Sequence, residues 1–194
     1  MNSILIYPQL EFAKIQIPTP PYSILFIADY LLKRNVDVKI FDLRFDKLSQ
    51  VFDAISNNEP EFIGISVMTG PQIHYALKSC ESIKNEFNKI KIVWGGVHST
   101  ILPTQTLQNK FIDFVIRGEG EKAYYELVSG KNISQIKNLS FKKGNKIFHN
   151  PNANLLTNSE INKLNIPWSL IKLKSSGVVF TQLFSRHKLF KINS

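Results

Sequence analysis

Cysteine is almost absent from this sequence, with Cys80 the only one among 194 residues. A single thiol excludes an internal disulfide framework and any multi-cysteine metal or cluster site formed by this chain alone. No apolar run approaches the roughly 18 residues that a membrane-spanning helix needs. The N-terminus lacks both a basic start and a small-residue cleavage site, so we expect no signal peptide and a cytoplasmic location.

Several common nucleotide-binding and catalytic motifs are missing as well. The sequence contains no GxxxxGK[ST] phosphate loop, and its first apolar run is not followed by GxGxxG. No serine or cysteine occupies a nucleophile elbow. Tyr7-Pro8 and Met68-Thr69 stand where a phospho-receiver domain would carry acidic residues. These absences disfavour P-loop, classical dinucleotide-binding, hydrolase and receiver functions.

Acidic residues are scarce in the last third of the chain. Residues 131–194 carry 11 Lys/Arg and only Glu160, whereas residues 1–130 carry 13 Lys/Arg and 14 Asp/Glu. This segment therefore accounts for the net charge of +9. Two interpretations of this charge pattern stay open: solvated loops that are rich in Lys and Asn, or a basic arm that docks on an acidic partner. No recognition helix or aromatic platform accompanies the lysines, which disfavours nucleic acid as a partner.

The first 130 residues alternate between buried-strand and amphipathic-helix patterns. Apolar runs predict strands at residues 4–8, 36–43, 61–70, 89–96 and 111–118. Helical spacing predicts helices at residues 23–35, 47–58, 71–87 and 119–130, with a short helix or turn at 99–109. Cys80 lies on the apolar stripe of the third helix and is expected to be a small buried hydrophobe.

Near-continuous apolar strands separated by helices are typical of a parallel sheet that is covered on both faces. The predicted fold class is therefore α/β, a doubly wound, flavodoxin- or Rossmann-like five-stranded parallel sheet with strand order 2-1-3-4-5.

The pattern changes after residue 130. Two short alternating runs around Lys143-Gly144-Asn145 predict a hairpin at residues 138–150. Residues 151–171 have little periodicity and are interpreted as an extended linker, and residues 176–194 begin like a strand and end in basic residues. We therefore expect an α/β domain at 1–130 and a basic hairpin and linker extension at 131–194.

Ligands of such sheets bind outside the carboxyl ends of the strands, near the point where strand order reverses. The loops gathered there are unusual in composition. Residues 8–22 form a long proline-rich loop, Ser66 and Thr69 follow the third strand, and Gly95-Gly96 ends the fourth. Two glycines allow a flat or nucleotide-like group to lie against the backbone. The alternative is a tight strand-to-helix turn that needs glycine for itself.

Four segments carry a resemblance to a known family. They are PTPPYSILFIADYL, GISVMTG, WGGVHSTILP and DFVIRGEGEKAYYELV, in this order within residues 1–130. The sequence resembles the cobalamin-binding N-terminal domain of cobalamin-dependent radical S-adenosylmethionine enzymes. The later GNKIFHNP and LNIPWSLI resemble the linker that leads into the catalytic barrel of those enzymes.

This resemblance implies a corrinoid whose nucleotide tail runs down among the loops after strands three, four and five. The implied cofactor-binding residues are Ser66, Thr69, Gly70, Gly95, Gly96, His98, Thr100, Gly118, Glu119 and Gly120. Together with Glu121, the last three of these residues form the GEGE turn, residues 118–121, which borders the pocket. Two alternatives stay open: the glutamates complement a helix N-terminus, and His98 is a hydrogen-bonded loop histidine.

Two departures from corrinoid proteins shape the expected function. The loop after the first strand has no histidine, whereas methionine synthase-type proteins carry Asp-x-His-x-x-Gly there. We therefore expect cobalamin bound base-off, without a histidine ligand. The CxxxCxxC motif that holds a [4Fe–4S] cluster is also absent, and Ser185-Arg186 is followed by no cysteine. No metal ligands or catalytic residues are therefore assigned to this chain.

The expected chain is a truncated radical-enzyme relative, inactive alone, with the cluster and S-adenosylmethionine held by a missing or partner half. Two rival hypotheses remain. The chain is one subunit of a split radical enzyme, or it is a flavodoxin-like binding or interaction module that takes no corrinoid.

Overall fold

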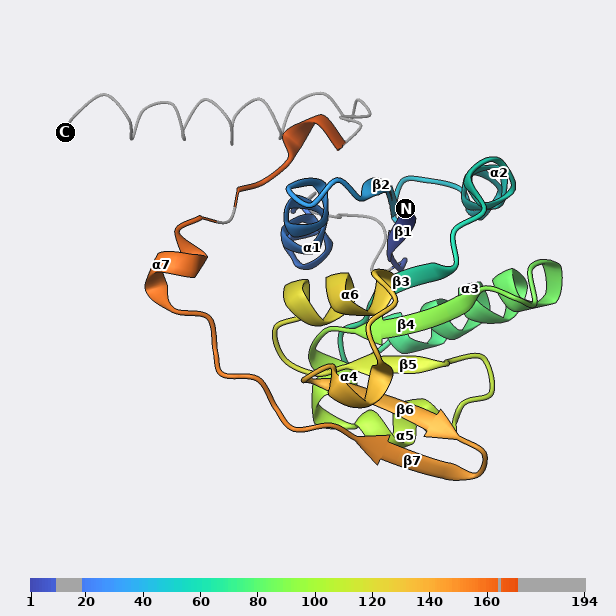
Figure 1. Ribbon diagram of the computed structural model, residues 1–194. Helices are drawn as coiled ribbons and strands as arrows, with labels where there is room; N and C mark the ends of the chain where they lie inside the picture. The colour runs from blue at the N-terminus through green and yellow to red at the C-terminus, as the bar shows by residue number, and fades with distance from the viewer. Residues whose placement is uncertain (10–18, 164, 171–194) are drawn as a thin grey trace.

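The computed structural model describes residues 1–9, 19–163 and 165–170, which form an α/β fold built on one sheet (Figure 1). The strand order is β2-β1-β3-β4-β5-β6-β7. The strands are β1 (Asn2–Tyr7), β2 (Asp37–Asp42), β3 (Phe62–Ser66), β4 (Lys91–Gly95), β5 (Phe114–Ile116), β6 (Leu139–Lys143) and β7 (Lys146–His149). The first five strands pair in parallel, so the predicted order 2-1-3-4-5 is confirmed.

The sheet has seven strands among the described residues, two more than the five predicted. The hairpin expected at residues 138–150 forms, and its first strand, β6, pairs antiparallel with β5. Leu139 and Phe141 of β6 are buried in the same apolar cluster as Ile116 of β5. Burying these two side chains extends the apolar core, and this burial stabilises the hairpin at the edge of the sheet.

Helices cover both faces of the sheet, as the apolar strands required. The helices are α1 (Tyr22–Leu32), α2 (Leu48–Asn58), α3 (Gln72–Glu86), α4 (Val97–Ile101), α5 (Pro103–Gln108) and α6 (Glu121–Val128). α1 and α6 pack on one face, and α2, α3 and α5 pack on the other. Ile4, Leu5 and Ile6 of β1 are each at most 1% exposed and alternate between these two cores. Cys80 is buried in the second of these faces, as predicted.

The segment predicted as one short helix or turn after β4 is two helices. α4 ends at Ile101, and α5 begins with Pro103 at its first position. Proline keeps the preceding residue out of helical conformation, and Leu102 has φ −125° and ψ 54°. This break turns the chain before β5.

The described part of the C-terminal extension contains short elements. They are η1 (Ile133–Gln135), α7 (Asn158–Ile161) and η2 (Trp168–Leu170). The segment interpreted as an extended linker thus holds two single turns, the first capped by Thr157 and Glu160. The strand-like start expected at 176–194 and most of the proline-rich loop at 8–22 lie outside the described residues. Within the described part of the chain, no helix is long and apolar enough to cross a bilayer.

Candidate functional site

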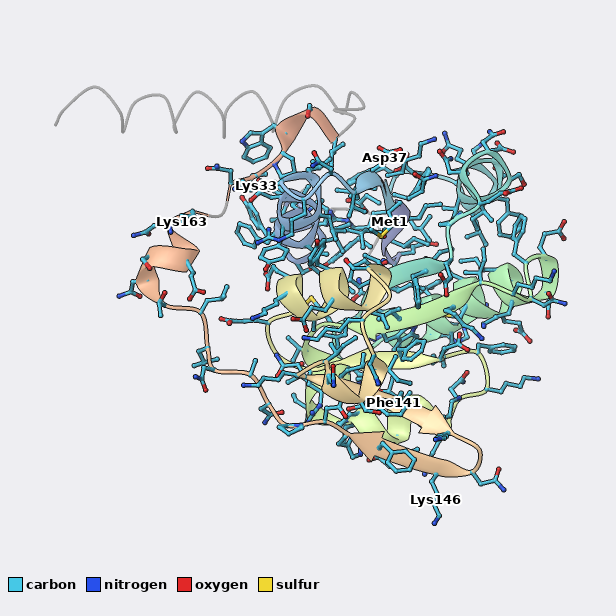
Figure 2. All side chains as sticks on the ribbon, in the orientation of Figure 1. Met1, Lys33, Asp37, Phe141, Lys146 and Lys163 are labelled. Carbon is cyan, nitrogen blue, oxygen red and sulfur yellow. The ribbon has the colours of Figure 1, made fainter. Side chains whose placement is uncertain are left out.

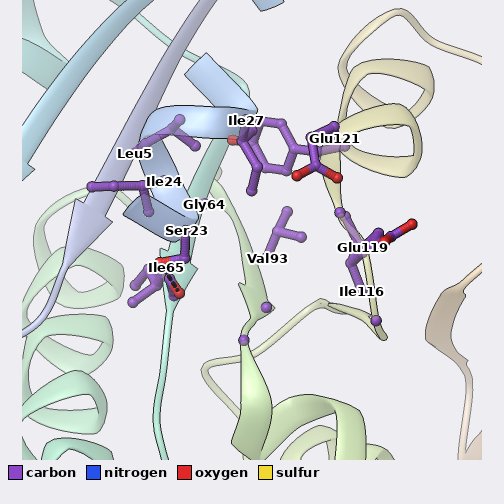
Figure 3. Close-up of a pocket in the computed structure, with 16 residues that line it drawn as sticks. Leu5, Ser23, Ile24, Ile27, Gly64, Ile65, Val93, Ile116, Glu119 and Glu121 are labelled. Atoms are coloured by element: carbon purple, nitrogen blue, oxygen red, sulfur yellow. Dashed lines mark hydrogen bonds between the residues drawn. The ribbon is translucent and has the colours of Figure 1, made fainter. Parts of the chain in front are cut away.

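A cavity of about 130 Å³ opens between the α1–α6 face and the carboxyl ends of the parallel strands (Figure 3). Leu5, Gly64 and Val93 form its floor, and Ile24 and Ile27 of α1 form one wall. It therefore spans the junction of β1 with β3, where the strand order reverses. This is the place where doubly wound sheets bind ligands. The lining is mainly apolar, with polar groups confined to the rim.

The floor depends on Gly64, a residue that sequence reasoning missed. A Cβ at this position would lie 2.7 Å from Leu5 Cδ2 and 2.8 Å from Tyr124 Cε2. Tyr124 of α6 is buried, lines the cavity and shares a 2.9 Å hydrogen bond with the Ser3 hydroxyl, which fixes its ring next to Gly64. A glycine within an apolar strand indicates close approach by another group, and this was the available sequence signal.

Gly95 and Gly96 lie together at the rim but have different structural roles. A Cβ on Gly95 would meet no atom nearer than the Ile116 carbonyl oxygen at 4.0 Å. Gly96 has φ +91°, and a Cβ there would lie 2.7 Å from the Val67 carbonyl oxygen. The fold itself therefore requires glycine at position 96, whereas position 95 only keeps space open.

The rim beside these glycines carries two hydroxyl groups. Ser66 Oγ donates a 2.8 Å hydrogen bond to Ser23 Oγ, which joins the end of β3 to the first turn of α1. Both serines line the cavity, and Ser66 is buried. Hydroxyls can donate and accept, so this pair can bind either type of ligand group.

The opposite rim is the GEGE turn between β5 and α6. Gly118 has φ +63°, and its backbone N–H donates to Thr100 Oγ1 at 2.9 Å. Thr100 Oγ1 in turn donates to the Gly96 carbonyl oxygen, also at 2.9 Å. Thr100 thus ties the two glycine-containing rims together without lining the cavity itself.

The two glutamates of this turn point in different directions in Figure 3. Glu121 extends toward Ile27 across the cavity, and Glu119 points away from it. Burial raises the pKa of the Glu121 carboxyl, and repulsion from Glu119 adds to the rise. Glu119 Oε2 accepts a 2.7 Å hydrogen bond from the Leu156 backbone N–H.

The structure brings together six of the ten predicted site residues. The cavity is lined by Ser66, Gly95, Gly96, Gly118, Glu119 and Gly120, and also by Glu121. Thr69, Gly70, His98 and Thr100 do not line it. Gly70 lies in the turn after β3 and has φ +108°, a backbone conformation that favours glycine.

His98 is the second residue of α4 and does not line the cavity. Its ring is 7% exposed and packs edge-on against Trp94, with ring centroids 6.3 Å apart. Burial lowers its pKa, and its Nδ1 has no hydrogen-bond partner. Among the described residues, no group of three or more His, Cys, Asp or Glu side chains could hold a metal ion.

Comparison with known proteins gives a consistent assignment. The family model described as "B12 binding domain" matches residues 10–128. An uncharacterized methyltransferase, PH0819, from Pyrococcus horikoshii is 31% identical over 93% of this chain and 41% of its own length. An anaerobic magnesium-protoporphyrin IX monomethyl ester cyclase from Rubrivivax gelatinosus is 30% identical over 66% of this chain and 24% of its own length.

Solved structures share the fold. The radical S-adenosylmethionine methyltransferase TsrM from Kitasatospora setae, with cobalamin and a [4Fe–4S] cluster bound, superposes with a TM-score of 0.68 at 19% identity. That match covers 85% of this chain and 31% of TsrM. OxsB, a cobalamin-dependent S-adenosylmethionine radical enzyme, gives a TM-score of 0.69 at 18% identity, over 79% of this chain and 22% of OxsB. The chain thus spans less than half the length of these relatives.

Proposed function

Because the chain belongs to the B12-binding domain family, we propose that it binds cobalamin with the nucleotide tail in the cavity under α1 and α6. The observation that carries this proposal is the open space in front of Gly95. Apart from the neighbouring residues of the chain, the nearest atom to the position that a Cβ would take there is the Ile116 carbonyl oxygen at 4.0 Å. Space kept open beside a buried strand end suits a flat ring that approaches the backbone.

The size of the cavity supports entry by the tail alone. Its volume of about 130 Å³ is well below the several hundred Å³ of a pocket for a whole drug-sized ligand. The corrin ring must then lie outside, on the carboxyl edge of the sheet. Met68, Val97 and Ile101 at this edge are 50%, 54% and 65% exposed. Apolar side chains gathered beside a cavity mouth are typical of a binding surface, and the macrocycle would cover them.

The residues around the cavity favour base-off binding. No described histidine lines it, because His74 lies on α3, His98 is buried against Trp94 and His149 lies on β7. A tail base held inside the cavity is separated from the corrin on the edge. When bound, cobalamin supplies cobalt chemistry that depends on its axial ligands. The protein residues hold and orient the tail and exclude water from it.

We assign the radical chemistry to protein outside these 194 residues, in the same polypeptide or in a partner chain, because the 194 residues contain a single cysteine. The described part of this chain has no cluster of metal ligands for a [4Fe–4S] centre. Its relatives are longer and include cobalamin-dependent radical enzymes. Residues 1–130 then carry the corrinoid, and the basic extension from residue 131 connects them to the catalytic partner. This arrangement makes the chain a cofactor module and leaves the substrate to the partner.

A valine at position 95 tests the proposal. The Cβ of Gly95→Val would meet no atom nearer than the Ile116 carbonyl oxygen at 4.0 Å, so we expect the chain to fold, and its two methyl groups would occupy the space in front of β4. We expect the native chain to retain corrinoid after incubation with hydroxocobalamin, reduction and desalting, with a base-off visible spectrum. The variant should retain at least 10-fold less, as expected when about 1.4 kcal/mol or more of binding is lost.

Gly144→Ala is the matched control because it perturbs a glycine far from the cavity. Gly144 lies in the hairpin turn with φ +58°, and a Cβ there would meet nothing within 4 Å. It should lose about 1 kcal/mol of stability to the unfavourable φ and retain corrinoid fully. Full retention by folded Gly95→Val would refute tail binding in this cavity. A yellow flavin spectrum of the purified native chain would instead favour the flavodoxin-like alternative.

A further inference from the structure

Residues 151–163 and 165–170, here called the strap, run back from the hairpin edge toward α1 (Figure 1). Sequence patterning gave this segment no role beyond that of a linker. Its polar contacts join two elements that form opposite walls of the cavity. One anchor lies on the GEGE turn, and the other lies on α1.

The first anchor is built from Glu119 and Asn138. Glu119 Oε2 accepts a hydrogen bond from the Leu156 N–H at 2.7 Å, and Asn138 Oδ1 accepts one from the Ala153 N–H at 2.7 Å. Asn138 Nδ2 also donates to the Glu119 carbonyl oxygen at 3.2 Å. Two strap amides are therefore held by a single linked pair, one member of which borders the cavity.

The second anchor lies near the C-terminal end of α1. Lys33 Nζ donates to the Lys163 carbonyl oxygen at 2.7 Å (Figure 2), and Asp29 Oδ2 accepts from the Asn165 N–H at 3.2 Å. Asp29 is buried and also pairs with Lys33 at 2.6 Å. Leu170 then packs against the apolar core under α1 and α6. The strap thus connects the turn that precedes α6 with α1.

We propose that the strap couples cofactor occupancy to the position of the chain beyond the pocket, with Glu119 and Asn138 as positioning residues. A group that fills the cavity restrains the GEGE turn, because residues 118–121 line it. The same turn holds the amides of Ala153 and Leu156, so its restraint tightens the strap. Thermodynamic linkage requires the converse, in which a tightened strap strengthens ligand binding.

This coupling rests on the proposed corrinoid binding and gives that binding a structural consequence. The strap follows the last strand of the sheet, so its anchors determine where the chain leaves the pocket. In a longer or two-part enzyme, that exit determines where a catalytic partner can lie. Binding of the cofactor would then determine the position of the catalytic partner relative to the pocket, through the backbone amides of Ala153 and Leu156.

Asn138→Gly removes the Asn138 side-chain part of the first anchor without changing a residue that lines the cavity. Asn138 has φ +65°, which glycine adopts freely, so the backbone turn is preserved and both side-chain hydrogen bonds are lost. Asn35→Gly is the matched control, because Asn35 has φ +58° and lies outside the first anchor and the cavity. Both variants replace a left-handed asparagine by glycine.

Amide hydrogen exchange with and without reduced hydroxocobalamin measures the coupling in the full chain. In the native chain and in Asn35→Gly, corrinoid should slow exchange at Ala153 and Leu156 by about 5-fold or more. In Asn138→Gly, the Ala153 amide has lost its acceptor and should exchange fast in either condition, whereas the Leu156 amide keeps its hydrogen bond to Glu119 Oε2. The dissociation constant for the corrinoid should rise by a similar factor.

Unchanged exchange at both amides in a native chain that visibly carries corrinoid would overturn the coupling and leave the proposed function intact. A native chain that takes up no corrinoid overturns both, and its visible spectrum identifies that case. If Asn138→Gly does not fold, Glu119→Ala and Glu119→Gln replace it. Glu119→Gln keeps an acceptor for the Leu156 amide, so it should keep both the slowed amide exchange and the dissociation constant for the corrinoid that Glu119→Ala loses. Equal exchange of the strap amides in these two variants would contradict the positioning role.

Discussion

Alanine at position 96 should destabilise the protein for reasons that have nothing to do with a ligand. The new Cβ would lie 2.7 Å from the Val67 carbonyl oxygen, 2.9 Å from the Val67 nitrogen and 3.1 Å from Ser66 Oγ. The first two atoms are backbone of the segment after β3, which is tied to Gly95 by a 2.9 Å hydrogen bond. Relief therefore requires the two strand ends to separate.

Two costs add at this position. The positive φ of +91° costs an L-residue about 1–2 kcal/mol, and overpacking costs about 1–3 kcal/mol more. Their sum of roughly 2–5 kcal/mol corresponds to a fall in Tm of roughly 4–20 °C for a chain of this size. Gly95→Ala should stay within about 2 °C of the native Tm, because its Cβ meets no close atom. Thermal unfolding followed by circular dichroism measures both, and a native-like Tm for Gly96→Ala would refute this reasoning.

Two further predictions concern buried titratable groups. Burial and the charge of Glu119 raise the pKa of the Glu121 carboxyl. The protonated carboxyl therefore contributes stability that is fully present below about pH 4.3, the unfolded-state pKa, and that is lost as pH rises through the folded-state pKa. Glu121→Gln should therefore resist urea better than the native chain at about pH 7, with no difference at about pH 4; equal midpoints at both would contradict the burial. Burial lowers the pKa of His98, so stability present above about pH 6.5 is lost as pH falls through the folded value. His98→Phe keeps a ring against Trp94 and should lose less stability between about pH 7 and 5 than the native chain, whereas an equal loss in urea melts would count against this assignment.

The main elements of the fold could be predicted because the inner strands β1, β3 and β4 of the parallel sheet are largely buried on both faces. Residues 62–66 of β3 are buried throughout, and such runs are visible in sequence without alignment. The hairpin was predicted, but its place in the sheet was not. Pairing of β6 with β5 depends on Leu139 and Phe141 meeting the α6 core, which is a long-range contact.

The rim of the cavity could be predicted, but its floor could not. Ser66, Gly95 and Gly96 follow from the rule that ligands bind at carboxyl strand ends. Gly64 lies in mid-strand, and its close approach to Leu5 and to the Tyr124 ring, which excludes a side chain there, becomes visible only in the fold. The ligand contact of Thr100 stays a prediction; in the structure its hydroxyl lies between the Gly96 carbonyl and the Gly118 amide.

The paired glycines show why one motif can serve two purposes at neighbouring positions. The positive φ of Gly96 carries the chain past Val67, and Gly95 beside it lines the cavity with no atom nearer to its Cβ position than the Ile116 carbonyl oxygen at 4.0 Å. Valine at position 95 and alanine at position 96 should therefore give opposite results. The first should lose corrinoid at native stability, and the second should lose stability whether or not corrinoid is present. If both variants lost corrinoid only in proportion to lost stability, the open space at Gly95 would be a consequence of the turn, and the tail would have to bind elsewhere.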